Sequence, residues 1–289
     1  MSAAAGPAVV AALGEDVDRL LSAEPKVRAD EPDSVHQMRV ATRRLRSVLR
    51  SYRKVFQRKD IDAIRDELRW LAGLLGVARD AEVRADRFAA LLAEYPDIQR
   101  RLGRRLVSSE RAAYTDAHRA VLHALDGERY TSLRTRLLGL RTDPPLRRKR
   151  AARDAEQVFT AAVRADLRRL QRRVRAEREV DDADCVEALH DIRKAAKRLR
   201  YSAEAATDVL DGPAEDLARH AKKVQSVLGD HRDAIEALAT ITARAEAVRT
   251  RGADTGPYEL LCAAEAEAAR TALDQYPALV EFLRYDYLS

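Results

Sequence analysis

The chain has 289 residues, and its 53 Lys and Arg against 47 Asp and Glu give a formal net charge of +6. A hydrophobic content of 46% excludes a disordered polybasic chain, two cysteines exclude a disulfide scaffold, and no apolar run is long enough to span a membrane. The first residues lack the basic region of a signal peptide. We therefore expect a soluble, cytoplasmic protein of one or two domains, because a domain takes roughly 100–200 residues.

Helices are predicted along the whole chain. Ala, Arg, Leu and Glu are abundant while Gly and Pro are scarce, and straight-chain residues lose little freedom in a helix. Apolar residues recur at steps of three and four, and no segment alternates with period two. In chain order the predicted helices cover 7–22, 34–57, 60–76, 79–94, 97–125, 129–139, 150–178, 184–210, 214–229, 231–250 and 257–285. The expected fold class is all-α.

The segment RTDPPLRRKR at 141–150 separates two halves of the chain. Pro144 and Pro145 cannot lie inside a helix. The basic cluster from Arg147 to Arg150 fits either the solvated flank of a linker or a patch that binds nucleic acid or carries a nuclear address, and the linker is favoured. The predicted division is therefore 1–143 and 144–289.

The two halves contain the same two motifs in the same order. VHQMRVATRRLRSVL begins at Val35 and LHDIRKAAKRLRYSA at Leu189. LLGVARDA at 74–81 and VLGDHRDA at 227–234 follow them, and the two offsets along the chain differ by one residue. We therefore predict a duplicated helical unit with approximate two-fold symmetry.

Each histidine-containing motif forms a helix with a cationic front and an apolar back. In the first copy the front and its flanks hold His36, Arg39, Arg43, Arg44, Arg46 and Arg50. In the second copy they hold His190, Arg193, Lys194, Lys197, Arg198, Arg200 and Tyr201. No acid lies between Ser34 and Lys59, so pairs within the helix cannot offset the repulsion, and an external polyanion or an acidic partner protein is expected.

The residue types favour phosphate as the ligand. The planar fork of Arg suits two-point contact with phosphate oxygens. Ser34 with Gln37 predicts a capping box, and Asp184 with Glu187 predicts a similar helix start, where the dipole favours an anion. Only one aromatic, Tyr201, lies on the two fronts, which favours a phosphate chain without bases over single-stranded nucleic acid.

The dipeptide His190-Asp191 leaves open a different chemistry, that of HD-type metal phosphohydrolases. That hypothesis needs further His and Asp ligands, and His36 is followed by Gln37 instead of Asp. Contact with phosphate fits the basic neighbours of both histidines better. Cys185 and Cys262 are predicted to be small buried residues. We expect no metal site, no cofactor and no catalytic residue.

The paired motifs resemble the signature of CHAD (conserved histidine α-helical) domains over nearly the whole chain. The resemblance implies two bundles of long antiparallel helices related by a pseudo-two-fold axis, with basic residues of both lining a central cavity. It implies non-catalytic binding of inorganic polyphosphate, or of other phosphate polyanions, and association with polyphosphate granules. Such domains often accompany a triphosphate-tunnel (CYTH) domain in one chain, and no acidic tunnel pattern precedes the first motif here.

The resemblance also assigns residues. The signature falls on His36, Arg39, Arg43, Arg44 and Arg46, and in the second copy on His190, Arg193, Lys197, Arg198 and Arg200. Arg69, Lys222 and Lys223, one to two turns before each LG-x-x-RDA motif, are predicted additions. Arg79 and Arg232 of those motifs either contact the ligand or pair with Asp80, Asp233 or other acids.

Overall fold

The computed structural model describes residues 3–181 and 184–288, and within them every extended regular element is a helix. The outer ends of the predicted halves, residues 1–2 and 289, lie outside this description. The first part contains α1 (Ala5–Arg28), α2 (Ser34–Ser51), η1 (Arg53–Val55), α3 (Arg58–Ala93), α4 (Pro96–Ile98), η2 (Gln99–Gly103), α5 (Arg104–Asp126) and α6 (Glu128–Thr142). The second contains α7 (Arg148–Ala151), α8 (Ala155–Glu177), α9 (Cys185–Glu204), α10 (Thr207–Arg249), α11 (Gly256–Asp274), α12 (Tyr276–Leu279) and η3 (Glu281–Arg284). The predicted all-α class is confirmed.

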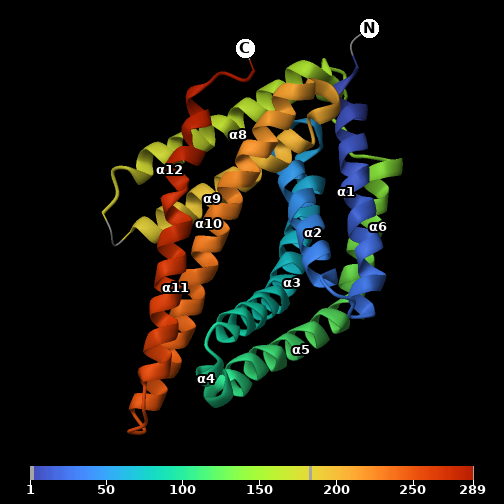
Figure 1. Ribbon diagram of the computed structural model, residues 1–289. Helices are drawn as coiled ribbons and strands as arrows, with labels where there is room; N and C mark the ends of the chain where they lie inside the picture. Colours follow the sequence, from blue (N-terminus) through green and yellow to red (C-terminus); the bar gives the residue numbers. More distant parts are fainter. Residues whose placement is uncertain (1–2, 182–183, 289) are drawn as a thin grey trace.

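Helices that carry equivalent motifs make equivalent contacts. In the first part α2 packs between α1 and α3, and in the second α9 packs between α8 and α10. Two long antiparallel pairs, α3 with α5 and α10 with α11, extend towards the far end of the molecule, and α2 meets α9 between the two parts (Figure 1). This arrangement agrees with a duplicated unit, while the pseudo-two-fold relation itself stays a prediction.

The apolar backs of the two signature helices are buried as predicted. Met38, Leu45 and Leu49 of α2 are inaccessible, as are Ile192 and Leu199 of α9. One continuous cluster of buried side chains includes residues of both parts. Within it the Tyr52 hydroxyl donates a 2.8 Å hydrogen bond to the Ser202 carbonyl, and the Tyr52 ring lies 4.6 Å from that of Phe159. The cavities described below are therefore formed between helices fixed by a shared core.

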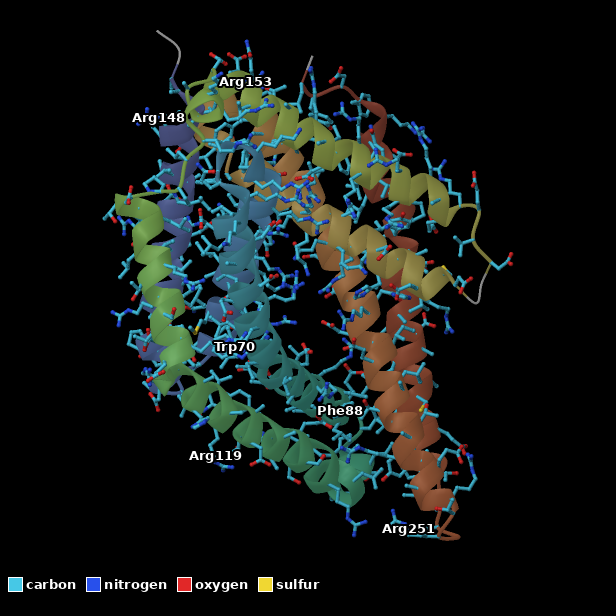
Figure 2. All side chains as sticks on the ribbon, turned by 180° about the vertical axis from the view of Figure 1, so that it is seen from behind. Trp70, Phe88, Arg119, Arg148, Arg153 and Arg251 are labelled. Atoms are coloured by element: carbon cyan, nitrogen blue, oxygen red, sulfur yellow. The ribbon has the colours of Figure 1, made fainter. Side chains whose placement is uncertain are left out.

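A second apolar cluster lies at the far end of the long helices. It contains Phe88 of α3, Leu106 of α5, Ile241 of α10 and Leu261 of α11. Figure 2 shows Phe88 where α3 approaches α10. The cluster joins the two long pairs of helices at a distance from the signature helices.

The segment between the two parts is fixed at both ends. The Gln57 amide donates to the Pro145 carbonyl at 2.7 Å, and the Arg147 amide donates to the Val55 carbonyl at 2.8 Å. Farther on, the Ala5 amide donates to the Arg153 carbonyl at 2.8 Å. Residues 145–153 thus run along η1 and the first turn of α1. None of the helices in the described residues is long and apolar enough to cross a bilayer.

Several predicted helix boundaries are wrong. The expected breaks after residue 76 and at residue 230 are absent, because α3 and α10 run through them. Gly76 and Gly229 lie inside these helices, where they accommodate arginines of the neighbouring helix. Asp211, with φ 48°, interrupts α10 near its start. The predicted helix 150–178 is two helices, since Asp154 caps a new one by accepting a hydrogen bond from the Gln157 amide.

Other boundaries differ by a turn or more. The first predicted helix continues past residue 22 to Arg28, and α2 ends at Ser51 where the prediction continued to 57. Residues 97–103 belong to α4 and η2, which precede α5. The helix predicted for 184–210 ends at Glu204, and the one predicted for 257–285 ends at Asp274 before two short helical segments.

Candidate functional site

Each signature helix is attached to a neighbour by a buried ion pair. Arg44 of α2 lies 2.6 Å from Asp16 of α1, and Arg198 of α9 lies 2.5 Å from Asp166 of α8. Both carboxylates are almost fully enclosed, with side-chain exposures of 0% and 1%. Burial raises the pKa of Asp16 and of Asp166, and the paired arginines oppose that effect. Two residues of the basic signature therefore hold the helices together.

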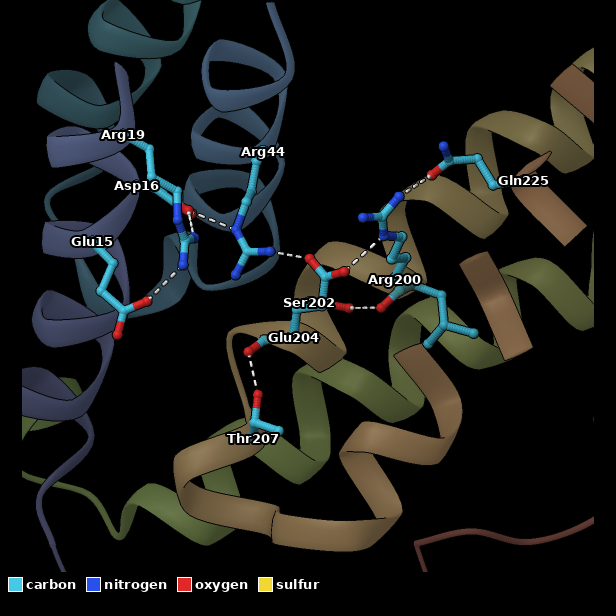
Figure 3. Close-up of polar contacts among 10 residues, drawn as sticks. Glu15, Asp16, Arg19, Arg44, Arg200, Ser202, Glu204, Thr207 and Gln225 are labelled. Carbon is cyan, nitrogen blue, oxygen red and sulfur yellow. Dashed lines mark hydrogen bonds and ion pairs between the residues drawn. The ribbon is translucent and has the colours of Figure 1, made fainter. Parts of the chain in front are cut away.

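Arg44 also takes part in a network between the two parts. Glu204 of α9 accepts a hydrogen bond from Arg44 and another, of 2.7 Å, from Arg200 (Figure 3). Arg200 is also 3.4 Å from the side-chain oxygen of Gln225. These arginines are therefore neutralised within the protein, and not by the expected external polyanion or acidic partner, because the acids come from other helices or from the end of α9.

The arginine that follows each signature histidine by three residues packs against the glycine of the second motif. A Cβ atom added at Gly76 would lie 3.6 Å from Nε of Arg39, and one added at Gly229 would lie 3.3 Å from Nη2 of Arg193. Arg39 is 3.3 Å from Asp80. Burial raises the pKa of Asp233, and the charge of nearby Arg193 counteracts this rise. The glycine and aspartate of LG-x-x-RDA therefore accommodate and neutralise an arginine of the first motif.

These arginines enclose a small pocket beside His36, which we call the histidine pocket. It has a volume of about 130 Å³ and is lined by His36, Arg39, Arg79, Asp80, Val83, Arg84, Arg87, Arg193, Arg232, Asp233 and Glu236. Six arginines thus face three acids. Arg79 lies 2.8 Å from Glu82, and Arg232 lies 2.5 Å from Glu236. Of the two roles considered for Arg79 and Arg232, the geometry favours ion pairing, with glutamates as partners.

Both signature histidines lie among cations. Burial lowers the pKa of His36, and the charge of Arg79 lowers it further. Burial and the charge of Arg232 act in the same way on His190. Each imidazole is therefore held in its neutral form near pH 7, where it can donate one hydrogen bond to an anion.

A larger pocket, the central cavity, lies between α2, α3, α8 and α9 and has a volume of about 420 Å³. Ten of its lining residues are basic and one is acidic: Arg43, Arg46, Arg50, Arg65, Arg69, Arg169, Arg173, Lys194, Lys197, Arg198 and Asp191. Ser47, Ala195 and Tyr201 complete the wall. Asp191 lies 2.5 Å from Lys194 and 3.1 Å from Arg173. Acids outside the wall pair with three more of these residues: Asp166 with Arg198, Asp62 with Arg65 and Asp66 with Arg69. The other basic residues of the wall exceed what Asp191 alone can neutralise.

The crowding of charge is strongest at Lys197. Its residue exposure is 8%, and burial followed by the charges of Arg43, Arg193 and Arg39 lowers its pKa to about 5. Burial, together with Arg39, lowers the pKa of Arg43 to about 10. Without an anion Lys197 is therefore uncharged near pH 7. The geometry provides a rigid, cationic site that a multiply charged anion would stabilise.

The motifs and helix pairs described above match a known family. The family model of the CHAD domain matches residues 11–242. The chain belongs to the CHAD domain family. Two curated proteins, Uncharacterized protein MT2285 and Uncharacterized protein Rv2226 of Mycobacterium tuberculosis strains CDC 1551 / Oshkosh and ATCC 25618 / H37Rv, are each 38% identical over 278 residues. These matches cover 94% of this chain and 52% of each relative, so the chain spans about half their length.

Solved structures share the CHAD fold. PptA from Streptomyces chartreusis superposes with a TM-score of 0.79 at 20% identity, covering 96% of this chain and 99% of PptA. The CHAD domain from the plant Ricinus communis superposes with a TM-score of 0.71 at 24% identity, covering 99% of this chain and 93% of that domain. The CHAD family is associated with polyphosphate binding, and membership supports a polyphosphate-related role.

The structure separates the predicted CHAD site residues into three groups. The first group lines the central cavity: Arg43, Arg46, Arg50, Arg69, Lys194, Lys197 and Arg198. The second group lines the histidine pocket: His36, Arg39 and Arg193. The third group lies in neither: Arg44, His190, Arg200, Lys222 and Lys223. Of these, Lys222 and Lys223 are exposed on α10.

Three residues of the cavity wall were missed by sequence reasoning. Arg65 lies one turn before Arg69 on α3, and Arg169 and Arg173 are four residues apart on α8. The spacing of the α8 pair indicates one helix face. Only the assembled fold reveals that this face is opposite α2.

The structure does not favour metal chemistry at the HD dipeptide. Asp191 is engaged by Lys194 and Arg173, as noted above. Across the described part of the chain, no three His, Cys, Asp or Glu residues lie close enough to share a metal ion. Cys185 and Cys262, predicted to be small buried residues, are half-buried.

The predicted helix caps are also wrong. Ser34 is the first helical residue of α2, and Asp33, with φ 61°, precedes it without a capping hydrogen bond from its side chain. Asp184 likewise makes no side-chain cap at α9. Asp33 instead lies 3.5 Å from Arg79 of α3. The turn before α2 is thus shaped by a contact between helices that the local pattern could not reveal.

Proposed function

We propose that this CHAD domain is a non-catalytic module that binds inorganic polyphosphate in the central cavity. The observation that carries the proposal is the composition of the wall, where ten basic residues from four helices face one acid. Single phosphate ions could neutralise part of this charge. A chain of linked phosphates neutralises several cations at the entropic cost of one molecule, so it is the favoured ligand.

The arrangement of the cations supports a flexible anion without bases. The single aromatic in the cavity wall, Tyr201, has a residue exposure of 3%, so it offers no open ring for a base to stack on. Single-stranded nucleic acids obtain much of their affinity from such stacking. Inorganic polyphosphate has no bases, so its binding depends on charge and needs no stacking.

The cavity is proposed to act by binding alone. A phosphohydrolase would need a general base or a metal to activate water. Asp191, the one carboxylate in the wall, is held between two cations that stabilise its charged form and lower its pKa. Such a carboxylate is a weak base.

The direct test replaces Arg43, Arg46, Arg50 and Arg69 together by Ala. We expect the affinity for long-chain polyphosphate, measured by calorimetry, to fall at least about tenfold, and its dependence on salt to weaken by up to about 3 in log–log slope, or 0.7 per lost contact. The matched control replaces the exposed Arg111, Arg134, Arg136 and Arg251 by Ala, which removes the same formal charge elsewhere. Equal losses in both variants would refute the assignment of the cavity.

Selectivity is tested against single-stranded RNA of matched charge. We expect polyphosphate to bind the wild-type chain more tightly at every salt concentration. Equal affinity for the two ligands would favour a general binder of single-stranded nucleic acid. Release of phosphate from polyphosphate with added Mn²⁺ or Mg²⁺, lost in His190→Ala, would instead favour a phosphohydrolase.

Two wider proposals follow from this function. The domain would associate with polyphosphate granules in the cytoplasm, and a fluorescent fusion carrying the four cavity substitutions should lose that location. In a longer chain it would hold polyphosphate beside a companion such as a triphosphate-tunnel (CYTH) domain. Either role requires only that the central cavity binds polyphosphate.

A further inference from the structure

Lys197 differs from the other lysines of the chain in its surroundings. All the others are exposed, whereas Lys197 is buried in the wall of the central cavity. The amine of Lys194, three residues earlier on α9, lies 2.5 Å from Asp191 and 3.6 Å from Glu187. No carboxylate of the described residues forms such a pair with Lys197, and the charges that act on it most strongly are arginines. A buried amine without an acid partner contributes no ion pair to the fold, so we looked for a role towards a ligand.

The side chain lies where the central cavity and the histidine pocket approach each other. Lys197 and Arg43 line the central cavity. Arg39, Arg193 and Arg232, whose charges also act on Lys197, line the histidine pocket. Arginines of α3 and α8 complete the wall of the cavity, and its single acid is paired with other cations. Cations of α2, α9 and α10 therefore surround this amine.

These surroundings make the amine of Lys197 a nucleophile. Burial and the neighbouring charges lower its pKa to about 5, so nearly all of it is unprotonated at pH 7. An ordinary lysine with a pKa of about 10.5 is unprotonated in only about one molecule in 3,000 at that pH. Desolvation and adjacent cations are general means by which proteins activate a lysine for attack. The missing component is an electrophile held beside the amine.

The central cavity favours electrophiles that carry a phosphate group. Its volume of about 420 Å³ lies within the range of roughly 300–1,000 Å³ that is usual for pockets that hold small molecules. Arg43 and Arg46 of its wall have no carboxylate partner among the described residues, and guanidinium groups bind phosphate oxygens at two points. A small molecule that contains both a phosphate and a reactive carbonyl is therefore concentrated beside Lys197. Acyl phosphates combine the two on adjacent atoms.

We propose that Lys197 is a modification site, at which Nζ is acylated by acyl phosphates bound in the central cavity. The lone pair of Nζ attacks the carbonyl carbon, and the bond from that carbon to the phosphate oxygen breaks. The phosphate leaves with the electron pair of that bond and takes the proton that the nitrogen loses. The products are an N-acylated lysine and hydrogen phosphate.

Acylation and polyphosphate binding exclude each other at this site. The amide that forms is neutral and takes up no proton near pH 7, so the cavity loses a cation that a polyanion would recruit. Bound polyphosphate in turn favours the protonated amine, which has no lone pair for the attack. This mutual exclusion rests on the proposed function of the central cavity, whereas the acylation itself does not.

The test treats the full wild-type chain with acetyl phosphate at pH 7 and follows each lysine by peptide mass spectrometry. We expect Lys197 to react about tenfold faster than an exposed lysine, because weaker nucleophilicity offsets only part of the roughly 3,000-fold gain in free amine. Between about pH 6.5 and 8.5 the rate at Lys197 should stay constant, whereas rates at exposed lysines should rise about a hundredfold. The acyl donor p-nitrophenyl acetate, which lacks a phosphate, should show a smaller preference for Lys197.

Two variants identify the reacting amine. Lys197→Arg should lose the fast incorporation of acetyl groups. Lys59→Arg, at an exposed lysine of α3 that lines neither pocket, should retain it. The proposal is overturned if Lys197 reacts no faster than the exposed lysines, or if its rate rises with pH as theirs does. An equal preference for Lys197 with both acyl donors would also overturn it, because the phosphate would then play no part.

Polyphosphate distinguishes this proposal from the function proposed above. At ten times its dissociation constant, long-chain polyphosphate should slow acetylation of Lys197 about tenfold, because about one-tenth of the protein remains free. Acetylation of Lys59 should not change. If Lys197 reacts fast and polyphosphate does not protect it, the modification site stands and the assignment of polyphosphate to the cavity fails. If polyphosphate binds but Lys197 does not react fast, the modification site alone fails.

Discussion

The central cavity and the histidine pocket are built from the same pair of motifs, but their charge balance differs. Ten basic residues face one acid in the cavity, whereas six arginines face three acids in the histidine pocket. The difference shows that some residues of the basic signature form ion pairs within the protein, whereas others remain available to an anion. Arg39 and Arg193 have partners within the protein, while Arg43 and Lys197 are crowded by further cations.

The largest effect is expected from Arg44→Met, which tests whether this signature arginine stabilises the fold and does not bind the ligand. Asp16 would lose its closest cation while its carboxylate stays buried, and only Arg19 would still reach it. Breaking a buried pair costs about 3–5 kcal/mol, and we expect about 3 kcal/mol here, measured by urea unfolding. Polyphosphate affinity of the folded protein should change little. A large loss of affinity without loss of stability would place Arg44 in the binding site.

The role of the central cavity in binding is tested by measuring how many protons the protein takes up when polyphosphate binds. Lys197 has a pKa of about 5 in the free protein, and a polyanion in the cavity would raise it. Binding at pH 7 should therefore take up about one proton at Lys197, measured by calorimetry in buffers of different ionisation enthalpy. Lys197→Met should remove that part of the uptake. Unchanged uptake in the variant would show that Lys197 does not face the ligand.

The same lysine predicts how stability depends on pH. Between about pH 5 and 10.5 the unfolded state binds a proton at Lys197 that the folded state does not, so stability contributed by this group rises with pH across that window. Lys197→Met should flatten the rise without lowering stability at pH 7. An unchanged slope would mean that the lysine is charged in the folded protein.

A smaller effect is expected from the one acid of the cavity. Asp191→Asn frees Lys194 and Arg173 and removes a like charge from the path of the ligand. An interaction of about 1 kcal/mol, the Coulomb energy of two charges 4 Å apart in water, corresponds to about fivefold tighter polyphosphate binding in a direct titration. Weaker binding would indicate that Asp191 positions those cations productively.

The smallest expected effect is a difference in stability between alanine substitutions at Gly76 and at Gly229, the two equivalent glycines that contact an arginine. Gly76→Ala should stabilise the protein by about 0.5–1 kcal/mol, because the nearest atom of Arg39 is at ordinary contact distance and alanine favours a helix interior. Gly229→Ala should gain less, because Arg193 lies 3.3 Å away and must move. The two thermal midpoints measure the difference. A larger gain at residue 229 would show that Arg193 yields freely.

Sequence reasoning could predict the fold class and part of the site for identifiable reasons. The burial of Met38, Leu45 and Leu49 follows from a periodicity that is local to one helix. The partners of Arg44 and Arg198 could not be predicted, because Asp16 and Asp166 lie on other helices and no local pattern connects them. Two predicted helices end at Gly76 and Gly229, whereas each glycine occupies a helix interior beside an arginine.

The backbone pairing of residues 145–155 has a consequence for folding during synthesis on the ribosome. The Ala5 amide at the start of α1 donates to the Arg153 carbonyl, the Ala155 amide donates to the Ala3 carbonyl just before α1, and Phe56 is bridged to Leu146. A nascent chain that has emerged only as far as residue 143 therefore lacks the hydrogen-bond partners of the residues at the start of its first helix. Those contacts can form only after about a dozen further residues have emerged, so the start of the first half depends on the start of the second half for these hydrogen bonds.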